Sequence, residues 1–148
     1  MAALNVLITA ASRRVPLVLA FEAALTRIGH GGRVVVTDVN PMSPAVHMAD
    51  TWYPVPFATD PGYVDALLAI CEAEHVGLIV PTIDDELELL SQQAGAFSRR
   101  GIRVAVSPHA TCRICNDKYS AWWYLANNAA CHGEADAMYH VVRVASHW

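Results

Sequence analysis

Three polar segments of this sequence carry side chains that could bind or convert a charged ligand. The first contains a serine and two consecutive arginines, the second ends in an aspartate, and the third holds a threonine and three carboxylates. Guanidinium groups bind carboxylate or phosphate oxygens, whereas clustered carboxylates bind cations or exchange protons. Each segment follows an apolar run of strand length. The candidate residues are Ser12, Arg13, Arg14, Asp38, Thr82, Asp84, Asp85 and Glu86.

The first of these segments lies inside a predicted strand–turn–helix unit at residues 4–28. Residues 6–8 are apolar without alternation, as expected for a parallel strand covered on both faces. Ser12 is predicted to cap a helix that starts near residues 12–14, with Pro16 in its first turn. Such a unit typically opens a doubly wound α/β domain, in which ligands bind at the carboxyl ends of the strands. The predicted buried stripe of the helix is Val18, Phe21, Leu25 and Ile28.

The rest of the chain alternates between predicted strands and helices. Further strands are predicted at residues 33–38, 77–80 and 102–106, and the proline-containing residues 52–55 are a candidate strand at an edge. Helices are predicted to begin at Asp60-Pro61, near Asp85, at Ser107-Pro108 and at Lys118, capped by Asn116 or Asp117. This order predicts a three-layer Rossmann-like α/β domain, with a parallel sheet of four strands, or five if the edge candidate pairs.

Two of the polar segments have alternative explanations that involve no ligand. Asp38 ends a predicted strand where a dinucleotide fold places its ribose acid, but the first turn lacks the G-x-G-x-x-G glycines. An NAD site is therefore not expected, and Asp38 is predicted to cap the Asn40-Pro41 turn. The three acids after Thr82 suit a helix N-terminus for the dipole alone, and this explanation stands beside a role in binding a substrate or metal.

Composition excludes several classes of protein. The 148 residues, 54% hydrophobic and 16% charged, predict one compact domain rather than a disordered chain. A net charge of −4 argues against nucleic-acid binding, and no apolar run reaches membrane-spanning length. The N-terminus does not resemble a signal peptide, so we expect a cytoplasmic protein.

The four cysteines are predicted to be thiols, as is usual in the cytoplasm. His109, Cys112 and Cys115, with Cys131-His132 downstream, have the ligand types of a zinc site. The spacing does not supply a matched second pair, and Cys112 and Cys115 fit equally well as small apolar residues of a short helix. No metal site is therefore predicted.

Taken together, several segments resemble a known family. They are NVLITAASRRVPLV, VVVTDVNPMSPAVHMAD, WYPVP, LIVPTIDDELELLS and RVAVSPHATCRICNDKYSAWWYL, which cover residues 5–125 in order. This set resembles the N-terminal, or pre-ATP-grasp, domain of ATP-grasp ligases, and is most similar to the carbamoyl-phosphate-synthase-like group of carboxylate–amine ligases.

The resemblance implies an enzyme that uses ATP and magnesium to phosphorylate a carboxylate, which an amine then attacks. It implies that Lys118 contacts the ATP phosphates, as a compact cation at a helix start is suited to do. It also implies that residues 10–14 and 81–86 face the substrate cleft. No catalytic residue is predicted, because Ser12, Ser107 and Ser120 lack the context of an activated hydroxyl.

The C-terminal part departs from the family pattern. We predict a pre-ATP-grasp domain at residues 1–126 and a divergent tail at 127–148, such as a truncated gene or a shifted reading frame would produce. The ATP-grasp lobes and their magnesium ligands are expected to lie outside this chain, so the isolated chain is expected to be incompetent as a ligase.

A partner is expected to compensate for the missing lobes. Trp122, Trp123, Tyr124 and the tail are the predicted contacts, either with a separate ATP-grasp chain or with a second copy. The alternatives to a ligase domain are a non-catalytic small-molecule-binding module and a self-associating Rossmann-like module.

Overall fold

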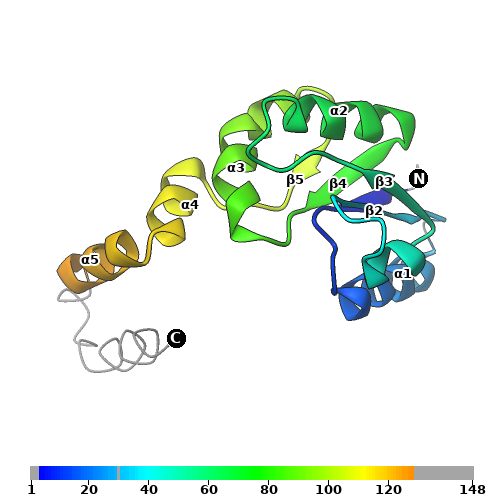
Figure 1. Ribbon diagram of the computed structural model, residues 1–148, viewed down its shortest axis with the longest axis horizontal. Helices are drawn as coiled ribbons and strands as arrows, with labels where there is room; N and C mark the ends of the chain where they lie inside the picture. Colours follow the sequence, from blue (N-terminus) through cyan, green and yellow to red (C-terminus); the bar gives the residue numbers. More distant parts are fainter. Residues whose placement is uncertain (1–3, 30, 129–148) are drawn as a thin grey trace. The chain divides into compact units, whose positions relative to one another are not determined.

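A computed structural model describes residues 4–29 and 31–128, which belong to two compact units (Figure 1). The first unit ends at Ser107 and the second begins at Pro108. The elements of the first unit are β1 (Asn5–Ile8), α1 (Val15–Ile28), β2 (Val34–Asp38), the 3-10 helix η1 (Pro44–His47), β3 (Thr51–Pro54), α2 (Tyr63–Ala73), β4 (Val76–Val80), α3 (Asp84–Ser98) and β5 (Arg103–Val104). The second unit contains α4 (His109–Asn116) and α5 (Lys118–Asn128).

The first unit is built on one parallel sheet with the strand order β3-β2-β1-β4-β5. The central strand is β1, in which Leu7 pairs with Val35 of β2 on one side and with Ile79 of β4 on the other. The predicted α/β fold with a parallel sheet is therefore confirmed. The candidate edge strand pairs with β2, which gives the sheet five strands.

Alternate side chains of β1 enter two separate hydrophobic cores, because successive residues of a strand point to opposite faces. Val6 and Ile8 belong to the core that α1 and η1 cover. Leu7 belongs to the core formed with α2 and α3. Figure 1 shows α1 on one side of the sheet and α2 and α3 on the other, so the predicted three layers are confirmed.

The predicted N-cap of α1 is wrong. The helix begins at Val15 after Arg14, and no side chain caps it. Ser12 has a positive φ of 44°, and its backbone N–H donates to a carboxylate oxygen of Asp38 at 2.6 Å. The serine is thus part of a turn held by Asp38 of β2, and it lies two residues before Arg14, the N-cap position of the helix. The last residue of the predicted stripe, Ile28, is also exposed, to 52%, at the end of α1.

The start of α2 also differs from the prediction. Asp60 and Pro61 precede the helix, which begins at Tyr63. The Asp60 carboxylate accepts a hydrogen bond from the backbone N–H of Gly62 at 2.8 Å, two residues along the chain. An aspartate that bonds its own backbone in this way forms a turn rather than a helix cap.

In the second unit, Asp117 caps the start of α5, and it is one of the two residues, Asn116 and Asp117, predicted to do so. Its carboxylate accepts hydrogen bonds from the backbone N–H groups of Tyr119 and Ser120 and from the Ser120 hydroxyl at 2.6 Å. The Ser120 hydroxyl and the Tyr119 amide lower the pKa of this carboxyl group. No helix in the described ranges is long and apolar enough to cross a membrane. Most of the predicted tail, from residue 129 onward, lies outside the described residues.

Candidate functional site

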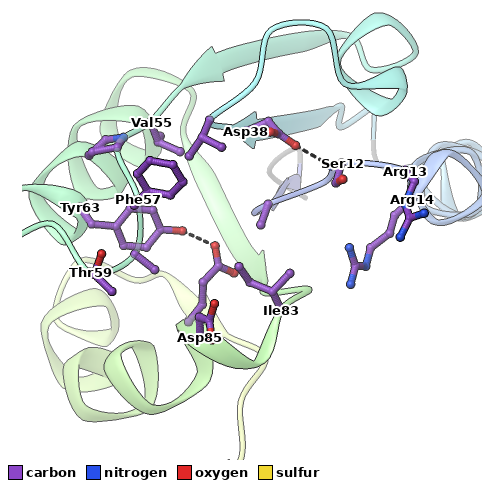
Figure 2. Close-up of a pocket in the computed structure, with 15 residues that line it drawn as sticks. Ser12, Arg13, Arg14, Asp38, Val55, Phe57, Thr59, Tyr63, Ile83 and Asp85 are labelled. Carbon is purple, nitrogen blue, oxygen red and sulfur yellow. Dashed lines mark hydrogen bonds between the residues drawn. The ribbon is translucent and has the colours of Figure 1, made fainter. Parts of the chain in front are cut away.

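A cavity of about 490 Å³ opens at the carboxyl ends of β1, β2, β3 and β4, as expected of ligand sites in doubly wound folds (Figure 2). The turn after β1 contributes Arg13 and Arg14, and the end of β2 contributes Asp38. The segment after β3 supplies residues 55–59, and α3 supplies Asp85 and Glu86. The topology therefore brings all three polar segments of the sequence to one cavity.

The turn between β1 and α1 is held in place by neighbouring elements. Ala10 and Ser12 both have positive φ, which residues other than glycine rarely adopt. Asp38 fixes this turn through the Ser12 amide, and its other oxygen accepts the Asn40 amide at 2.8 Å. The predicted role of Asp38 in the Asn40 turn is therefore confirmed, and the same side chain also joins β2 to the β1–α1 turn.

Thr82 connects the turn after β1 with the turn after β4. Its hydroxyl donates to the backbone oxygens of Thr9 and Ala10, at 2.9 and 2.8 Å. Its own backbone oxygen accepts a hydrogen bond from the Arg14 guanidinium. Thr82 does not line the cavity, so its contacts position the turn instead.

Glu86 is a buried carboxyl group in the cavity wall, with 2% of its surface exposed. The Thr9 hydroxyl donates to one of its oxygens at 2.6 Å, and the Tyr63 hydroxyl donates to the other (Figure 2). Burial raises the pKa of Glu86, although these hydrogen bonds, one from the Thr82 backbone and the nearby charge of Arg14 act in the opposite direction. Glu86 therefore takes up a proton more readily than an exposed glutamate does.

The two sides of the cavity differ in chemistry. Figure 2 shows Val55, Phe57 and Tyr63 on one side, with Arg13 and Arg14 opposite them. Phe57 is 70% exposed although it is large and apolar. One side can therefore bury an apolar group of a ligand, while the other can bind an anion.

Comparison with known proteins identifies the family. The family of PylC-like N-terminal domains matches residues 6–105, about two thirds of the chain. The chain belongs to this family. The predicted N-terminal pre-ATP-grasp domain of carboxylate–amine ligases is thereby confirmed. No curated protein matches the chain significantly.

Solved structures of low sequence identity share the fold of this PylC-like domain. Glycinamide-RNase-transformylase T from Mycobacterium tuberculosis matches with a TM-score of 0.60 at 15% identity, over 84% of this chain and 35% of the other. N5-carboxyaminoimidazole ribonucleotide synthetase from Thermotoga maritima matches with a TM-score of 0.55 at 18% identity, over 84% of this chain and 30% of the other. A single-chain, multi-domain long-chain acyl-CoA carboxylase matches with a TM-score of 0.54 at 26% identity, over 83% of this chain and 12% of the other. The PylC-like chain thus spans about a third or less of each of these chains.

Most of the predicted cleft residues of the PylC-like domain meet at the cavity. Six of them line it: Ser12, Arg13, Arg14, Asp38, Asp85 and Glu86. Thr82 does not line the cavity but hydrogen-bonds the backbone of the turn that does, and Asp84 is not among the lining residues. Lys118 belongs to the second unit, where it is exposed as the first residue of α5.

Sequence reasoning missed the apolar wall. Val55, Phe57 and Tyr63 line the cavity but were not predicted as site residues. The available signal was Phe57, because a phenylalanine in a proline-rich loop directly after a strand has no obvious core to enter. Arg13 and Arg14 were selected because ligands of this fold bind at the carboxyl ends of the strands, and residues 55–59 also follow the carboxyl end of a strand.

Within residues 4–29 and 31–128, no three His, Cys, Asp or Glu side chains are grouped so that they could hold a metal ion. Within the described residues, Cys71, Cys112 and Cys115 form no disulfide, and burial raises the pKa of Cys71 to about 12. Cys131 and His132 lie outside the described residues.

Proposed function

We propose that this chain supplies the substrate-side domain of an ATP-dependent carboxylate–amine ligase of the carbamoyl-phosphate-synthase-like group. The observation that carries the proposal is the cavity itself. In a pre-ATP-grasp domain, it gathers two arginines and a shielded carboxyl group at the edge of the sheet where ligands bind. A substrate acid would lie in this cavity, and ATP phosphates would contact Lys118. The remaining lobes and the ligands for magnesium would come from outside residues 1–128.

Arg13 is the side chain best suited to bind the acid. It lines the cavity, and within the described ranges its guanidinium makes no hydrogen bond or ion pair. Arg14, in contrast, already donates to the Thr82 backbone. A planar guanidinium that is free to form two parallel hydrogen bonds is the usual partner of a carboxylate.

Lys118 offers a sharp test for ATP, because it is the only lysine of the chain. We expect calorimetric titration with ATP and magnesium to give binding in the full chain, with at least about a tenfold loss of affinity in Lys118→Ala. Arg113→Ala, which removes another exposed cation of the second unit, is the matched control and should bind ATP like the wild type.

A covalent probe checks the same contact independently. Periodate-oxidised ATP carries aldehydes that react with amines, and after borohydride reduction it should label Lys118, with protection by excess ATP. ATP binding that is equal in wild type and Lys118→Ala would contradict the assignment of Lys118. No ATP binding, together with binding of an acid in the cavity, would favour the alternative of a non-catalytic small-molecule-binding module.

A partner is the second element of the proposal. Helix α5 exposes a large apolar surface, and the side chains of Trp122, Trp123 and Tyr124 are 42%, 55% and 47% exposed. Aromatic residues are frequent anchors of protein interfaces, and so much exposed aromatic surface is unusual for a monomer. The partner would be a separate ATP-grasp chain or a second copy, which sedimentation at several concentrations, with and without a candidate chain, distinguishes.

The proposed location is the cytoplasm, where ATP is available. Cys71, Cys112 and Cys115 form no disulfide in the described part of the chain, which is consistent with a reducing compartment. Fractionation of cells that produce the tagged chain tests this location directly.

A further inference from the structure

Two exposed apolar side chains face the same cavity from consecutive strand ends. Phe57, after β3, is 70% exposed, and Val39, after β2, is 46% exposed. Exposed apolar residues are common on protein surfaces when they are isolated, but a pair that lines one concave site provides an apolar surface for a ligand. Val55 and Ile83 extend this surface within the cavity.

The charged groups of the cavity are unequally available. Arg14, Asp38 and Glu86 are engaged in hydrogen bonds with neighbouring backbone or side-chain groups. Arg13 and Asp85 line the cavity without a side-chain hydrogen bond or ion pair inside the described part of the chain. An anionic head group is therefore attracted to Arg13, whereas a second negative charge near α3 would be repelled by Asp85.

The size of the cavity sets a further limit. A volume of about 490 Å³ lies within the range of small-molecule sites. A ligand as small as acetate or bicarbonate would leave Phe57 and Val39 in water. A ligand that reaches from Arg13 to Phe57 must therefore carry an apolar body behind its charged group, because Figure 2 shows these two residues on opposite sides of the cavity.

We propose that the cavity binds a monocarboxylic acid with an apolar body, whose carboxylate contacts Arg13 and whose body packs against Phe57 and Val39. This inference rests on the proposed function, since it names the class of acid that the ligase domain would accept. It excludes small hydrophilic acids and dicarboxylates as the preferred ligands.

The test compares three probes that differ in one feature each. They are 3-phenylpropionate, propionate, which lacks the ring, and 3-phenylpropylamine, which has the opposite charge. Titration of the full chain is followed through the amide NMR signals of residues 12–14, 55 and 57–59. We expect 3-phenylpropionate to bind at least about tenfold tighter than propionate, since burial of a phenyl ring favours binding by more than that factor. The amine should not bind detectably.

Variants separate the two contacts. Phe57→Ala should weaken 3-phenylpropionate about fivefold or more and leave propionate unchanged, whereas Arg13→Gln should weaken both acids about tenfold. Met42→Ala and Arg99→Gln are the matched controls, because both residues are exposed and neither lines the cavity. Far-UV circular dichroism and thermal unfolding verify that each variant is folded.

The possible failures are distinguishable. Equal affinity for propionate and 3-phenylpropionate would overturn the apolar body while leaving the acid site of the proposed function intact. Binding of the amine in place of the acid would overturn the assignment of Arg13, and absence of all binding would overturn the inference as a whole. Failure of the ATP titration would count against the ligase and would not alter this ranking of acids.

Discussion

The two buried glutamates of the sheet domain, Glu74 and Glu86, lie at opposite ends of the strands and have different partners. Glu74 is 7% exposed near the amino ends, where Arg33 forms an ion pair with it at 2.6 Å and the Tyr53 hydroxyl donates to its other oxygen. Glu86 is 2% exposed at the carboxyl ends, where its side-chain partners are two neutral hydroxyl groups.

This difference separates a structural carboxylate from a candidate functional one. The charge of Glu74 is compensated by a contacting cation, and its backbone oxygen also accepts a hydrogen bond from Asn5. Glu86 has no cation in ion-pair contact among the described residues, and it faces a cavity. A buried carboxyl group without an ion-pair contact has a cost to stability, and such groups are common at binding and catalytic sites.

The largest effect on stability should come from removing the Glu74 carboxylate. Glu74→Ala removes the ion pair with Arg33 and the acceptor of the Tyr53 hydroxyl, and we expect a loss of about 2–3 kcal/mol in the free energy of unfolding. Urea denaturation measures it. Glu72→Ala is the control, since its ion pair with Arg100 is solvent-exposed and should contribute less than about 0.5 kcal/mol. Equal losses in the two variants would contradict the structural role of Glu74.

A smaller loss of stability should distinguish Tyr63, which donates to Glu86, from Tyr53, which donates to Glu74. Tyr63→Phe leaves one oxygen of Glu86 without its donor in a buried site, and should lower the free energy of unfolding by about 1–2 kcal/mol at neutral pH. Tyr53→Phe removes the donor to Glu74, which keeps Arg33, so a loss of about 0.5–1 kcal/mol is expected. The comparison fails if Tyr53→Phe proves the more costly substitution in denaturation experiments.

The smallest effect should appear in the pH dependence of stability. Because burial raises the pKa of Glu86, the folded chain binds more protons than the unfolded chain between the ordinary glutamate pKa and the raised one. Glu86 therefore makes stability fall as pH rises through this window, and Glu86→Gln should remove that part of the slope. Unfolding curves recorded from pH 4 upward for the wild type and Glu86→Gln test it. An unchanged slope in Glu86→Gln would disprove the assignment.

The sheet was predictable because each strand is marked by a pattern within its own few residues. Unalternating apolar runs such as residues 6–8 and 34–36 are typical of parallel strands, and they gave the order of the elements and the cavity end of the sheet. Even the prolines near residues 52–55 correctly indicated an edge. The arginines and acids at the strand ends followed from topology alone.

The remaining details depend on contacts between distant residues. Ser12 resembles a helix cap in the sequence, but Asp38, 26 residues away, holds its amide in a turn. Three consecutive acids at the start of α3 also look equivalent, yet only Glu86 meets Thr9 and Tyr63 and becomes buried. No local pattern distinguishes these cases, because the deciding partners lie on other strands and helices.

The central position of β1 has a consequence for synthesis on the ribosome. Asn5–Ile8 emerges first, but the sheet around it is complete only when Val76–Val80 pairs with it. At ordinary rates of translation, the roughly seventy residues between the two strands take about 4–14 s to be made. During that interval one hydrogen-bonding edge of the central strand of the sheet is open. Nascent chains should therefore depend on a chaperone until β4 appears, and slow codons within residues 40–75 would prolong that dependence.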